Sequence, residues 1–281
     1  MVFTAGIDVG TGAVKTVLYA VDGPSTRLIS KRCDRVRQRD PLKLAAEAYD
    51  QSLEAAGLKR DDIAYCATTG EGESLGFQTG HFYSMTTHAR GAIELDPASR
   101  AVLDVGALHG RAIRIDERGK VVGYKMTSQC ASGSGQFLEN IARYLGIAQS
   151  EIGALSQQAD DPEVVSSICA VLAETDVINM VSRGISAPNI LKGIHLSMAG
   201  RLAKLLKSTG FNRGVVMSTG GLALDSGLVA AMAEEIAAMK ETRITVRSHA
   251  DSIYAGAIGA ALWGAYRHEK LKSAGSLHRA A

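Results

Sequence analysis

Two stretches of the sequence decide the fold: Gly6-Ile7-Asp8-Val9-Gly10 near its start, and Ala101-Val102-Leu103-Asp104-Val105-Gly106 about a third of the way along. Each is a short apolar segment, typical of a buried β-strand, that ends in an aspartate followed by valine and a glycine turn. Each is also followed by two further strand-like segments, 14–20 and 28–36 in the first case, 111–115 and 121–126 in the second. The repeated pattern predicts a structural duplication, in which two related α/β units each begin with the same hairpin.

The rest of the chain mixes further strands with helices. Apolar residues recur with helical spacing in several segments, and short apolar runs between turns indicate additional strands. The predicted helices span 41–56, with Gly57 just beyond the end, and 136–145, 150–159, 170–183, 188–208, 228–239 and 251–266, with Ser150 as an N-cap. The predicted strands span 63–68, 214–218 and 244–246. We expect two lobes around a nucleotide cleft, 1–98 and 99–266, the second with a helical insertion, and a flexible tail over 267–281.

Composition limits the class of protein. The 281 residues are 46% hydrophobic, which is enough for a substantial core, and 31 basic against 29 acidic residues leave a net charge of +2. Nucleic-acid binders usually carry a stronger basic excess, so the densest basic run, 31–39, is interpreted as a solvated edge strand. No apolar segment reaches the roughly 20 residues of a membrane span, and the N-terminus does not resemble a signal peptide. We expect a cytoplasmic protein with neither nucleic acid nor membrane as a partner.

The first aspartate segment has the composition of a phosphate-binding turn. Gly10, Thr11 and Gly12 follow Asp8 directly, and glycines let backbone N–H groups approach phosphate oxygens. Asp8 could hold hydrated Mg²⁺, which favours one or two carboxylates together with phosphates. Lys15 follows closely enough to reach a phosphate. The segment predicts one half of a nucleotide site.

Two further segments would complete this site. Asp104 and Gly106 would present a second carboxylate and turn from the other lobe, and Gly220-Gly221 end a predicted strand where a nucleoside and its phosphates could approach. One such turn can be plain loop structure, but three in this order favour nucleotide binding. The chain has no Walker A motif, and Gly133-Ser134-Gly135 lacks the features of a dinucleotide loop.

Four cysteines form no CxxC pair, and their spacing matches no zinc pattern. Cys130 and Cys169 each lie just before a predicted helix, where the helix dipole and free N–H groups stabilise a thiolate. Thiolates are the ligands of iron–sulfur clusters, four for each [4Fe–4S] cluster, so two per chain would require a partner that supplies two more. Cys33 and Cys66 lie in strand-like segments and are interpreted as small buried apolar residues.

Over nearly its full length, from Gly6 to Tyr266, the chain resembles a known family. The matching stretches are GIDVGTGAVK, CASGSGQFLE, SSICAVLAETDVI, GIHLSMAGRL, the STGG turn and GAIGAAL. These resemble the ATPases of the benzoyl-CoA reductase and 2-hydroxyacyl-CoA dehydratase-activator family. The two cysteine segments are the most specific, since general sugar kinases lack them. The resemblance implies an α/β architecture with the duplicated, ribonuclease H-like actin/Hsp70/sugar kinase (ASKHA) fold.

The resemblance also implies cofactors and partners. It implies ATP and Mg²⁺ at the turns described above, with Asp8 and Asp104 as the catalytic carboxylates. It assigns Cys130 and Cys169 to half of a [4Fe–4S] cluster shared with a partner subunit. It implies a homologous ATPase subunit, catalytic reductase subunits and reduced ferredoxin as partners, in electron transfer to an aromatic ring.

One departure from the family pattern bears on hydrolysis. Activators usually carry Asp-Ile-Gly-Gly-Gln-Asp at the second segment, whereas this chain has Ala107-Leu108-His109 after Gly106, without the amide and the second carboxylate. Hydrolysis would then rely on Asp8 and Asp104, with or without His109, or would be slow. We interpret His109 as a locally packed loop residue.

The GALHG form and GGLALD over 220–225 most resemble the delta-type branch of the reductases. Three alternatives remain open: a homodimeric activator of a dehydratase, a sugar or small-molecule kinase of the same fold, and a binding subunit without hydrolysis.

Overall fold

The computed structural model describes residues 1–127, 135–165, 170–239 and 242–279. The described residues divide into two compact units, residues 1–97 with 253–281, and residues 98–252. Each unit is built on one five-stranded sheet. The two units are described separately below.

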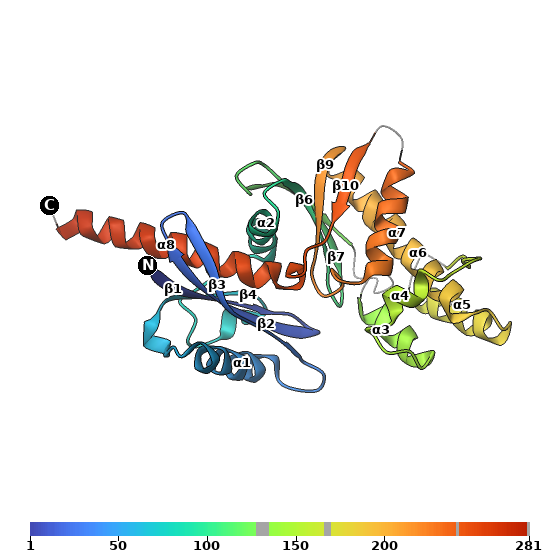
Figure 1. Ribbon diagram of the computed structural model, residues 1–281, viewed down its shortest axis with the longest axis horizontal. Helices are drawn as coiled ribbons and strands as arrows, with labels where there is room; N and C mark the ends of the chain where they lie inside the picture. The colour runs from blue at the N-terminus through green and yellow to red at the C-terminus, as the bar shows by residue number, and fades with distance from the viewer. Residues whose placement is uncertain (128–134, 166–169, 240–241, 280–281) are drawn as a thin grey trace. The chain divides into compact units, whose positions relative to one another are not determined.

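The sheet of the first unit has the order β3-β2-β1-β4-β5. Its strands are β1 (Val2–Val9), β2 (Ala13–Asp22), β3 (Ser25–Arg35), β4 (Ile63–Gly70) and β5 (Gly80–His81). β1 to β3 form an antiparallel meander, whereas β4 pairs in parallel with β1. Helix α1 (Pro41–Ala56) lies on one face of the sheet, and helices α2 (Ser84–Leu95) and α8 (Ala255–Arg279) lie on the other (Figure 1).

The local sequence explains the boundaries of α1. Asp40 caps the helix, because its side chain accepts hydrogen bonds from the N–H groups of Leu42 and Lys43 at 2.8 and 3.1 Å. Pro41 stands in the first turn, where its missing N–H leaves no helical hydrogen bond unmade. Gly57 ends the helix in the left-handed conformation, with φ of 65°, as the sequence predicts.

The second unit repeats the arrangement of the first. Its sheet has the order β10-β9-β6-β7-β8, which is the order of the first sheet read from the other end. The strands are β6 (Ser99–Val105), β7 (Gly110–Ile115), β8 (Val121–Met126), β9 (Arg213–Thr219) and β10 (Arg243–Arg247). The first three are again antiparallel, and β9 is again parallel to the first strand. The duplication predicted from the sequence is therefore confirmed.

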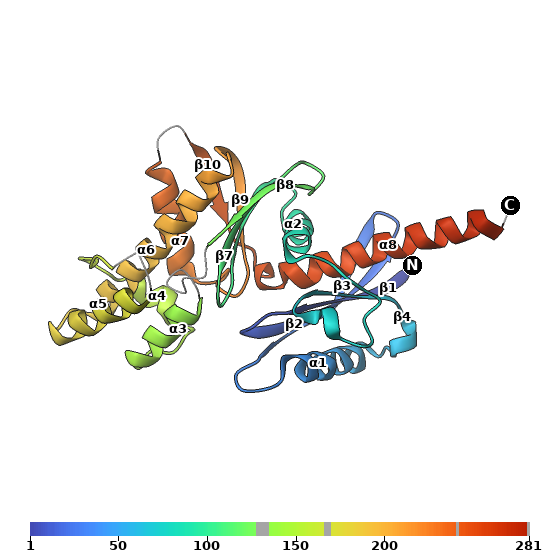
Figure 2. The ribbon, with the colours of Figure 1, turned by 180° about the vertical axis from the view of Figure 1, so that it is seen from behind.

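The helices of the second unit surround a large apolar core against this sheet (Figure 2). They are α3 (Gly135–Tyr144), α4 (Ile152–Ser156), α5 (Ala170–Ser182), α6 (Ala187–Ser208) and α7 (Ser226–Ala237). Ile190, Leu191, Ile194 and Met198 on α6 are fully buried. This helix is therefore the central element of the core beneath the sheet.

The structure differs from the sequence prediction at the C-terminus. Residues 253–281 belong to the first unit rather than to a lobe spanning 99–266, and α8 continues to Arg279, where a flexible tail was expected from 267. Close packing against α2 explains why the start of α8 belongs to the first unit: a Cβ on Gly259 would lie 1.8 Å from the carbonyl oxygen of Thr87, and one on Gly91 would lie 2.0 Å from that of Ala255. Only glycine permits these two helices to approach so closely. Residues 269–275 of α8 are exposed.

Two boundaries also differ from the sequence prediction. Helix α4 begins at Ile152 with Glu151 at the N-cap and ends at Ser156, so Ser150 is not its cap and the helix is shorter than expected. The Glu151 carboxylate instead accepts from the N–H of Ala148, at 3.3 Å. Strand β4 extends to Gly70, two residues beyond the predicted end.

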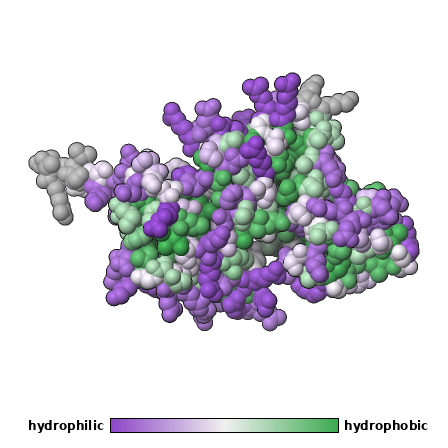
Figure 3. Space-filling view, viewed as in Figure 1, coloured by the Kyte–Doolittle hydropathy of each residue, from purple (hydrophilic) through white to green (hydrophobic). Residues whose placement is uncertain are grey.

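No helix in the described part of the chain is long and apolar enough to cross a membrane. The face seen in Figure 3 correspondingly intersperses hydrophilic and hydrophobic residues. The basic run over 31–39 begins on β3, the outer strand of its sheet, and Lys31 and Arg35 are exposed there. This agrees with the interpretation of the run as a solvated edge.

Candidate nucleotide site

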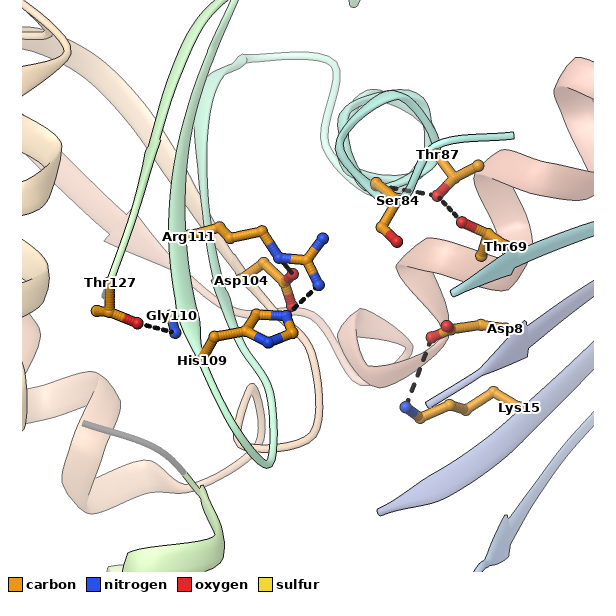
Figure 4. Close-up of polar contacts among 10 residues, drawn as sticks. All are labelled: Asp8, Lys15, Thr69, Ser84, Thr87, Asp104, His109, Gly110, Arg111 and Thr127. Atoms are coloured by element: carbon orange, nitrogen blue, oxygen red, sulfur yellow. Dashed lines mark hydrogen bonds and ion pairs between the residues drawn. The ribbon is translucent and has the colours of Figure 1, made fainter. Parts of the chain in front are cut away.

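The first unit pairs Asp8 with Lys15. The two residues are direct partners across the antiparallel strands β1 and β2, and the Lys15 Nζ lies 3.5 Å from Asp8 Oδ2 (Figure 4). Both residues are only 7% exposed. The predicted carboxylate and the predicted lysine are thus held together as an ion pair at the end of the first strand.

The turn between these strands leaves two N–H groups available. The N–H of Gly10 donates to the carbonyl oxygen of Ala13 at 3.1 Å and closes the hairpin. Thr11 and Gly12 are exposed, and their N–H groups make no backbone hydrogen bond within the described residues. The donors that this turn offers to an anion are therefore those of Thr11 and Gly12, with Gly10 supporting the turn.

The second unit repeats this geometry with Asp104 and Arg111. They are direct partners across β6 and β7, and Arg111 Nε lies 3.1 Å from Asp104 Oδ2. The N–H of Gly106 donates to the carbonyl oxygen of His109 at 2.9 Å, as Gly10 does to Ala13. Sequence reasoning missed Arg111, although its spacing from Asp104 copies that of Lys15 from Asp8.

His109 contacts the same arginine. The Arg111 guanidinium lies against His109 Nε2, so this ring nitrogen accepts from Arg111 (Figure 4). The interpretation of His109 as a locally packed loop residue is in line with this contact.

A threonine–glycine pair lies beside each aspartate. Asp8 is the register partner of Thr69 on β4, and Asp104 is that of Thr219 on β9. The glycine that follows each threonine has a positive φ, 68° at Gly70 and 85° at Gly220. The sequence predicted a role for Gly220 and Gly221 but not for Thr69 and Gly70, which the repeated Thr-Gly pattern would have indicated.

Gly220 and Gly221 have different roles. A Cβ on Gly220 would lie 2.4 Å from Asp104 Oδ1, so glycine is required for the turn to pass the carboxylate. A Cβ on Gly221 would meet no atom of the described residues within 4 Å. Gly220 is therefore required by the protein itself, whereas Gly221 borders open space that a ligand could occupy.

His88 and Gly256 are further neighbours of Asp8. A Cβ on Gly256 would lie 2.9 Å from both Asp8 Oδ2 and His88 Nε2. His88 is 4% exposed. The first turn of α8 thus approaches the predicted carboxylate, which periodicity in the sequence could not indicate.

The turn after Asp104 is bonded to helix α3. The N–H groups of Gly135 and Gln136, at the start of α3, donate to the carbonyl oxygens of Gly106 and Ala107, both at 2.9 Å. Two backbone hydrogen bonds therefore join the turn after Asp104 to the beginning of α3.

The two predicted cluster ligands lie outside the described residues. Cys130 falls in 128–134, directly before α3, and Cys169 falls in 166–169, directly before α5. Within the described parts of the chain, no three His, Cys, Asp or Glu residues are grouped closely enough to hold a metal ion.

The other two cysteines differ from each other. Cys66 is buried as expected, and burial raises the pKa of its thiol to about 12. Cys33 is exposed, because it faces outward on the edge strand β3, so the prediction of a buried residue was wrong there. Burial of its sulfur nevertheless raises the pKa of Cys33, opposed by the neighbouring Lys15.

The donor set fits a magnesium nucleotide. Each unit offers one carboxylate beside one cation and a turn with backbone N–H groups, and Mg²⁺ in nucleotide sites takes one or two carboxylates with phosphate oxygens. The carboxylate is that of Asp8 in the first unit and that of Asp104 in the second.

Comparison with known proteins gives a consistent result. The model of the BadF/BadG/BcrA/BcrD ATPase family matches residues 5–264. The D subunit of benzoyl-CoA reductase from Thauera aromatica is 74% identical over 98% of this chain and 97% of its own length. Component A of (R)-2-hydroxyglutaryl-CoA dehydratase from Acidaminococcus fermentans is similar in structure, with a TM-score of 0.87 and 30% identity over 96% of this chain and 100% of that chain. The activator of the 2-hydroxyisocaproyl-CoA dehydratase from Clostridium difficile, with bound ADPNP, has a TM-score of 0.85 and 29% identity over 96% of this chain and 97% of that chain. A ROK hexokinase from Thermus thermophilus shares the fold alone (TM-score 0.50, 15% identity, 95% and 99%), which confirms the actin/Hsp70/sugar kinase architecture.

Proposed function

Because the chain belongs to the BadF/BadG/BcrA/BcrD ATPase family, we propose that it is the ATP-hydrolysing, electron-transferring subunit of a benzoyl-CoA reductase. The support is the 74% identity to the D subunit of the Thauera enzyme over nearly the whole chain. It pairs with a homologous ATPase subunit, accepts electrons from reduced ferredoxin and passes them to the catalytic subunits that reduce the aromatic ring.

The nucleotide residues have distinct tasks in this proposal. The N–H groups of Thr11 and Gly12, with the Gly220-Gly221 turn, bind phosphates, and Asp8 and Asp104 hold hydrated Mg²⁺ and orient the attacking water. Lys15 balances the charge of Asp8, and Arg111 balances that of Asp104. Mg²⁺, when bound, neutralises charge on the phosphates.

Cys130 and Cys169 would supply two of the four thiolates of a [4Fe–4S] cluster shared with the homologous subunit. Such a cluster supplies one-electron chemistry. The potential of a one-electron centre changes by about 59 mV for each tenfold change in the equilibrium constant for its reduction. ATP can shift the protein between two conformations only if it binds them with different affinities.

The proposed coupling is supported by the two hydrogen bonds that join the turn after Asp104 to the start of α3. The carbonyl oxygens of Gly106 and Ala107 accept from Gly135 and Gln136, and Cys130 precedes that helix by a few residues. These two hydrogen bonds are the route by which a ligand held at Asp104 would influence the helix that follows Cys130.

Anaerobic purification with the partner subunits tests the proposal. We expect about two irons per chain of this kind, because four irons are shared by two chains. Cys130→Ser and Cys169→Ser should each abolish the iron, whereas Cys33→Ser is the matched control and should retain it. Iron retained in the Cys130→Ser complex would refute the cluster assignment.

The same preparation separates the alternatives. Asp8→Asn and Asp104→Asn should each remove this subunit's share of the ATP hydrolysis and leave that of the homologous subunit. If this subunit only binds nucleotide, it has no such share to lose. A homodimeric activator would purify without a second, homologous ATPase chain. A small-molecule kinase would be colourless and would transfer phosphate to an acceptor.

A further inference from the structure

A serine, a histidine and an aspartate, none of them a predicted site residue, form a buried network in the second unit. His195 on α6 has its Nδ1 2.9 Å from the Ser156 Oγ on α4 and its Nε2 3.4 Å from Asp225 Oδ2. Ser156 and His195 are completely buried. Asp225 is the N-cap of α7, where its carboxylate accepts from the N–H of Leu228 at 3.0 Å. Three helices thus meet at one imidazole.

The Ser156 hydroxyl decides which ring nitrogen of a neutral His195 carries the proton. The single hydroxyl proton of Ser156 lies toward the carbonyl oxygen of Gly153, at 3.1 Å. If it stays there, His195 Nδ1 donates to Ser156. If the hydroxyl turns to His195, Nδ1 accepts and the neutral ring carries its proton on Nε2, the nitrogen 3.4 Å from Asp225 Oδ2.

The Asp225 carboxylate is held ionised by its surroundings. Burial alone would raise its pKa, but the imidazole of His195 and the N–H groups of Gly227 and Leu228 together hold the pKa of Asp225 below its usual value. An ionised carboxylate without such a partner is strongly unfavourable in a protein interior. His195 therefore stabilises the charge of the residue that begins α7.

The network is packed without spare volume. A Cβ on Gly227 would lie 2.1 Å from Ser156 Oγ and 2.7 Å from His195 Nδ1. A substrate cannot reach these side chains, so the Ser, His and Asp here do not act as a hydrolytic triad. Their effect is to hold the start of α7 in one place.

Asp225 is connected by backbone hydrogen bonds to the turn that carries Gly220 and Gly221. Successive backbone hydrogen bonds join this turn to Asp225: Ala223 N–H to Gly220 O at 3.1 Å, and Asp225 N–H to Leu222 O at 3.0 Å. The N–H of Leu222 also donates to Val105 O, at 3.2 Å, next to Asp104. The turn is therefore fixed at one end by the aspartate strand and at the other by His195.

The same helix α6 holds a second segment. The Asn189 side chain accepts from the N–H groups of Asp160 and Asp161, each at 3.1 Å. A Cβ on Gly193 would lie 2.0 Å from the carbonyl oxygen of Glu163, and Glu163 pairs with Arg183 at 2.8 Å. Segment 160–165 is thus bound to α6 one to two turns from His195.

We propose that His195 is a positioning residue for the nucleotide site: through Asp225 it fixes the Gly220–Gly221 turn, and through α6 it joins that turn to segment 160–165. The inference rests on the proposed function, because it assumes that this turn binds phosphates. His195 itself does not touch the nucleotide.

Two substitutions of His195 separate its contacts. In His195→Gln the terminal amide nitrogen takes the place of Nε2 and can still donate to Asp225. In His195→Asn the shorter amide takes the place of Nδ1, which keeps the Ser156 contact and loses the one to Asp225. Both are polar and uncharged, so each serves as the folding control for the other. Ser156→Ala removes the remaining contact alone.

MgADP affinity is measured on the complex purified with its partner subunits. We expect His195→Asn to raise the dissociation constant at least tenfold, and His195→Gln and Ser156→Ala to change it less than threefold. Equal affinities in His195→Asn and the wild type would overturn the proposal. A wild-type complex that binds no MgADP would instead refute the proposed function on which it rests.

Amide hydrogen exchange gives a readout independent of activity. In the wild type and in His195→Gln, MgADP at saturating concentration should slow exchange in both 219–228 and 160–165. In His195→Asn, protection at 219–228 should occur without protection at 160–165. Should the His195→Asn complex fail to assemble, Asp225→Asn, which retains an N-capping side chain, replaces it with the same expected outcome; protection of 160–165 in that variant would overturn the proposal.

Discussion

Gly220 and Gly221 offer a sharp test, because the same substitution should have opposite consequences at adjacent positions. Gly220 has φ of 85°, and a left-handed conformation costs a residue with a side chain about 1–2 kcal/mol. The added Cβ would also lie 2.4 Å from Asp104 Oδ1, so the carboxylate must move from Arg111. Partial loss of that buried ion pair adds a similar amount, since complete loss costs about 3–5 kcal/mol.

We therefore expect Gly220→Ala to lower the free energy of unfolding by about 2–4 kcal/mol, which corresponds to a fall in Tm of roughly 5–15 °C for a unit of this size. Gly221→Ala should leave Tm within about 2 °C, because its Cβ would meet no atom of the described chain within 4 Å. Its effect should appear instead as a rise of at least tenfold in KM for ATP, since the open space beside it is where the ligand is expected.

The assays are thermal unfolding of the full chain, followed by circular dichroism, and steady-state ATP hydrolysis by the complex. A Gly220→Ala protein with the Tm of the wild type would refute the steric reasoning. A Gly221→Ala enzyme with unchanged KM would show that the open space is not used by nucleotide.

Three further predictions concern titratable groups. Because the pKa of Cys66 is about 12, only about one thiol in 10⁴ is ionised at pH 8. Iodoacetamide should therefore label exposed Cys33 before buried Cys66, as followed by mass spectrometry, and Cys66 should stay unlabelled until the protein is unfolded. The pKa of Asp225 is lowered in the folded protein. The ionised carboxylate therefore contributes fully to the free energy of unfolding above the unfolded-state pKa of about 3.9, and the contribution is lost as the pH falls through the lower folded-state pKa. Asp225→Asn should reduce the loss of stability at acid pH, measured by urea unfolding, and an unchanged acid dependence would contradict this. Arg111→Met should lower the free energy of unfolding by about 3 kcal/mol because the buried Asp104 carboxylate loses its ion pair with Arg111, and the double variant with Asp104→Leu should recover most of that loss in the same assay.

Much of the architecture could be predicted because it depends on local pattern. The strand ending in Asp8 and the strand ending in Asp104 are short apolar runs closed by glycine turns, and both were recognisable from neighbouring residues alone. The repeat of that pattern was sufficient to predict the duplication that the two sheets display. Helix α1 was predictable for the same reason, since both of its capping signals lie within the helix's own flanks.

The errors arose where a distant part of the chain decides the outcome. The start of α8 was assigned to the second lobe, yet Gly259 packs it against α2, which lies far earlier in the sequence. Cys33 was interpreted as a small buried apolar residue, as a free cysteine usually is, but it is exposed on β3, whose edge position the basic run had indicated. The partner of a helix is not encoded in periodicity.

The sequence by itself determined which residues stand at the ends of the strands, and therefore that Asp8, Gly10, Asp104, Gly106 and Gly220 occur where phosphate-binding turns form. Only the tertiary structure decided which side chains balance the charges of the carboxylates, because ion pairing depends on strand register and on contacts between elements far apart in the chain. Register places Lys15 opposite Asp8 and Arg111 opposite Asp104. Helix packing brings His195 to Asp225 in the interior, where an unpaired charge would be too unfavourable to persist.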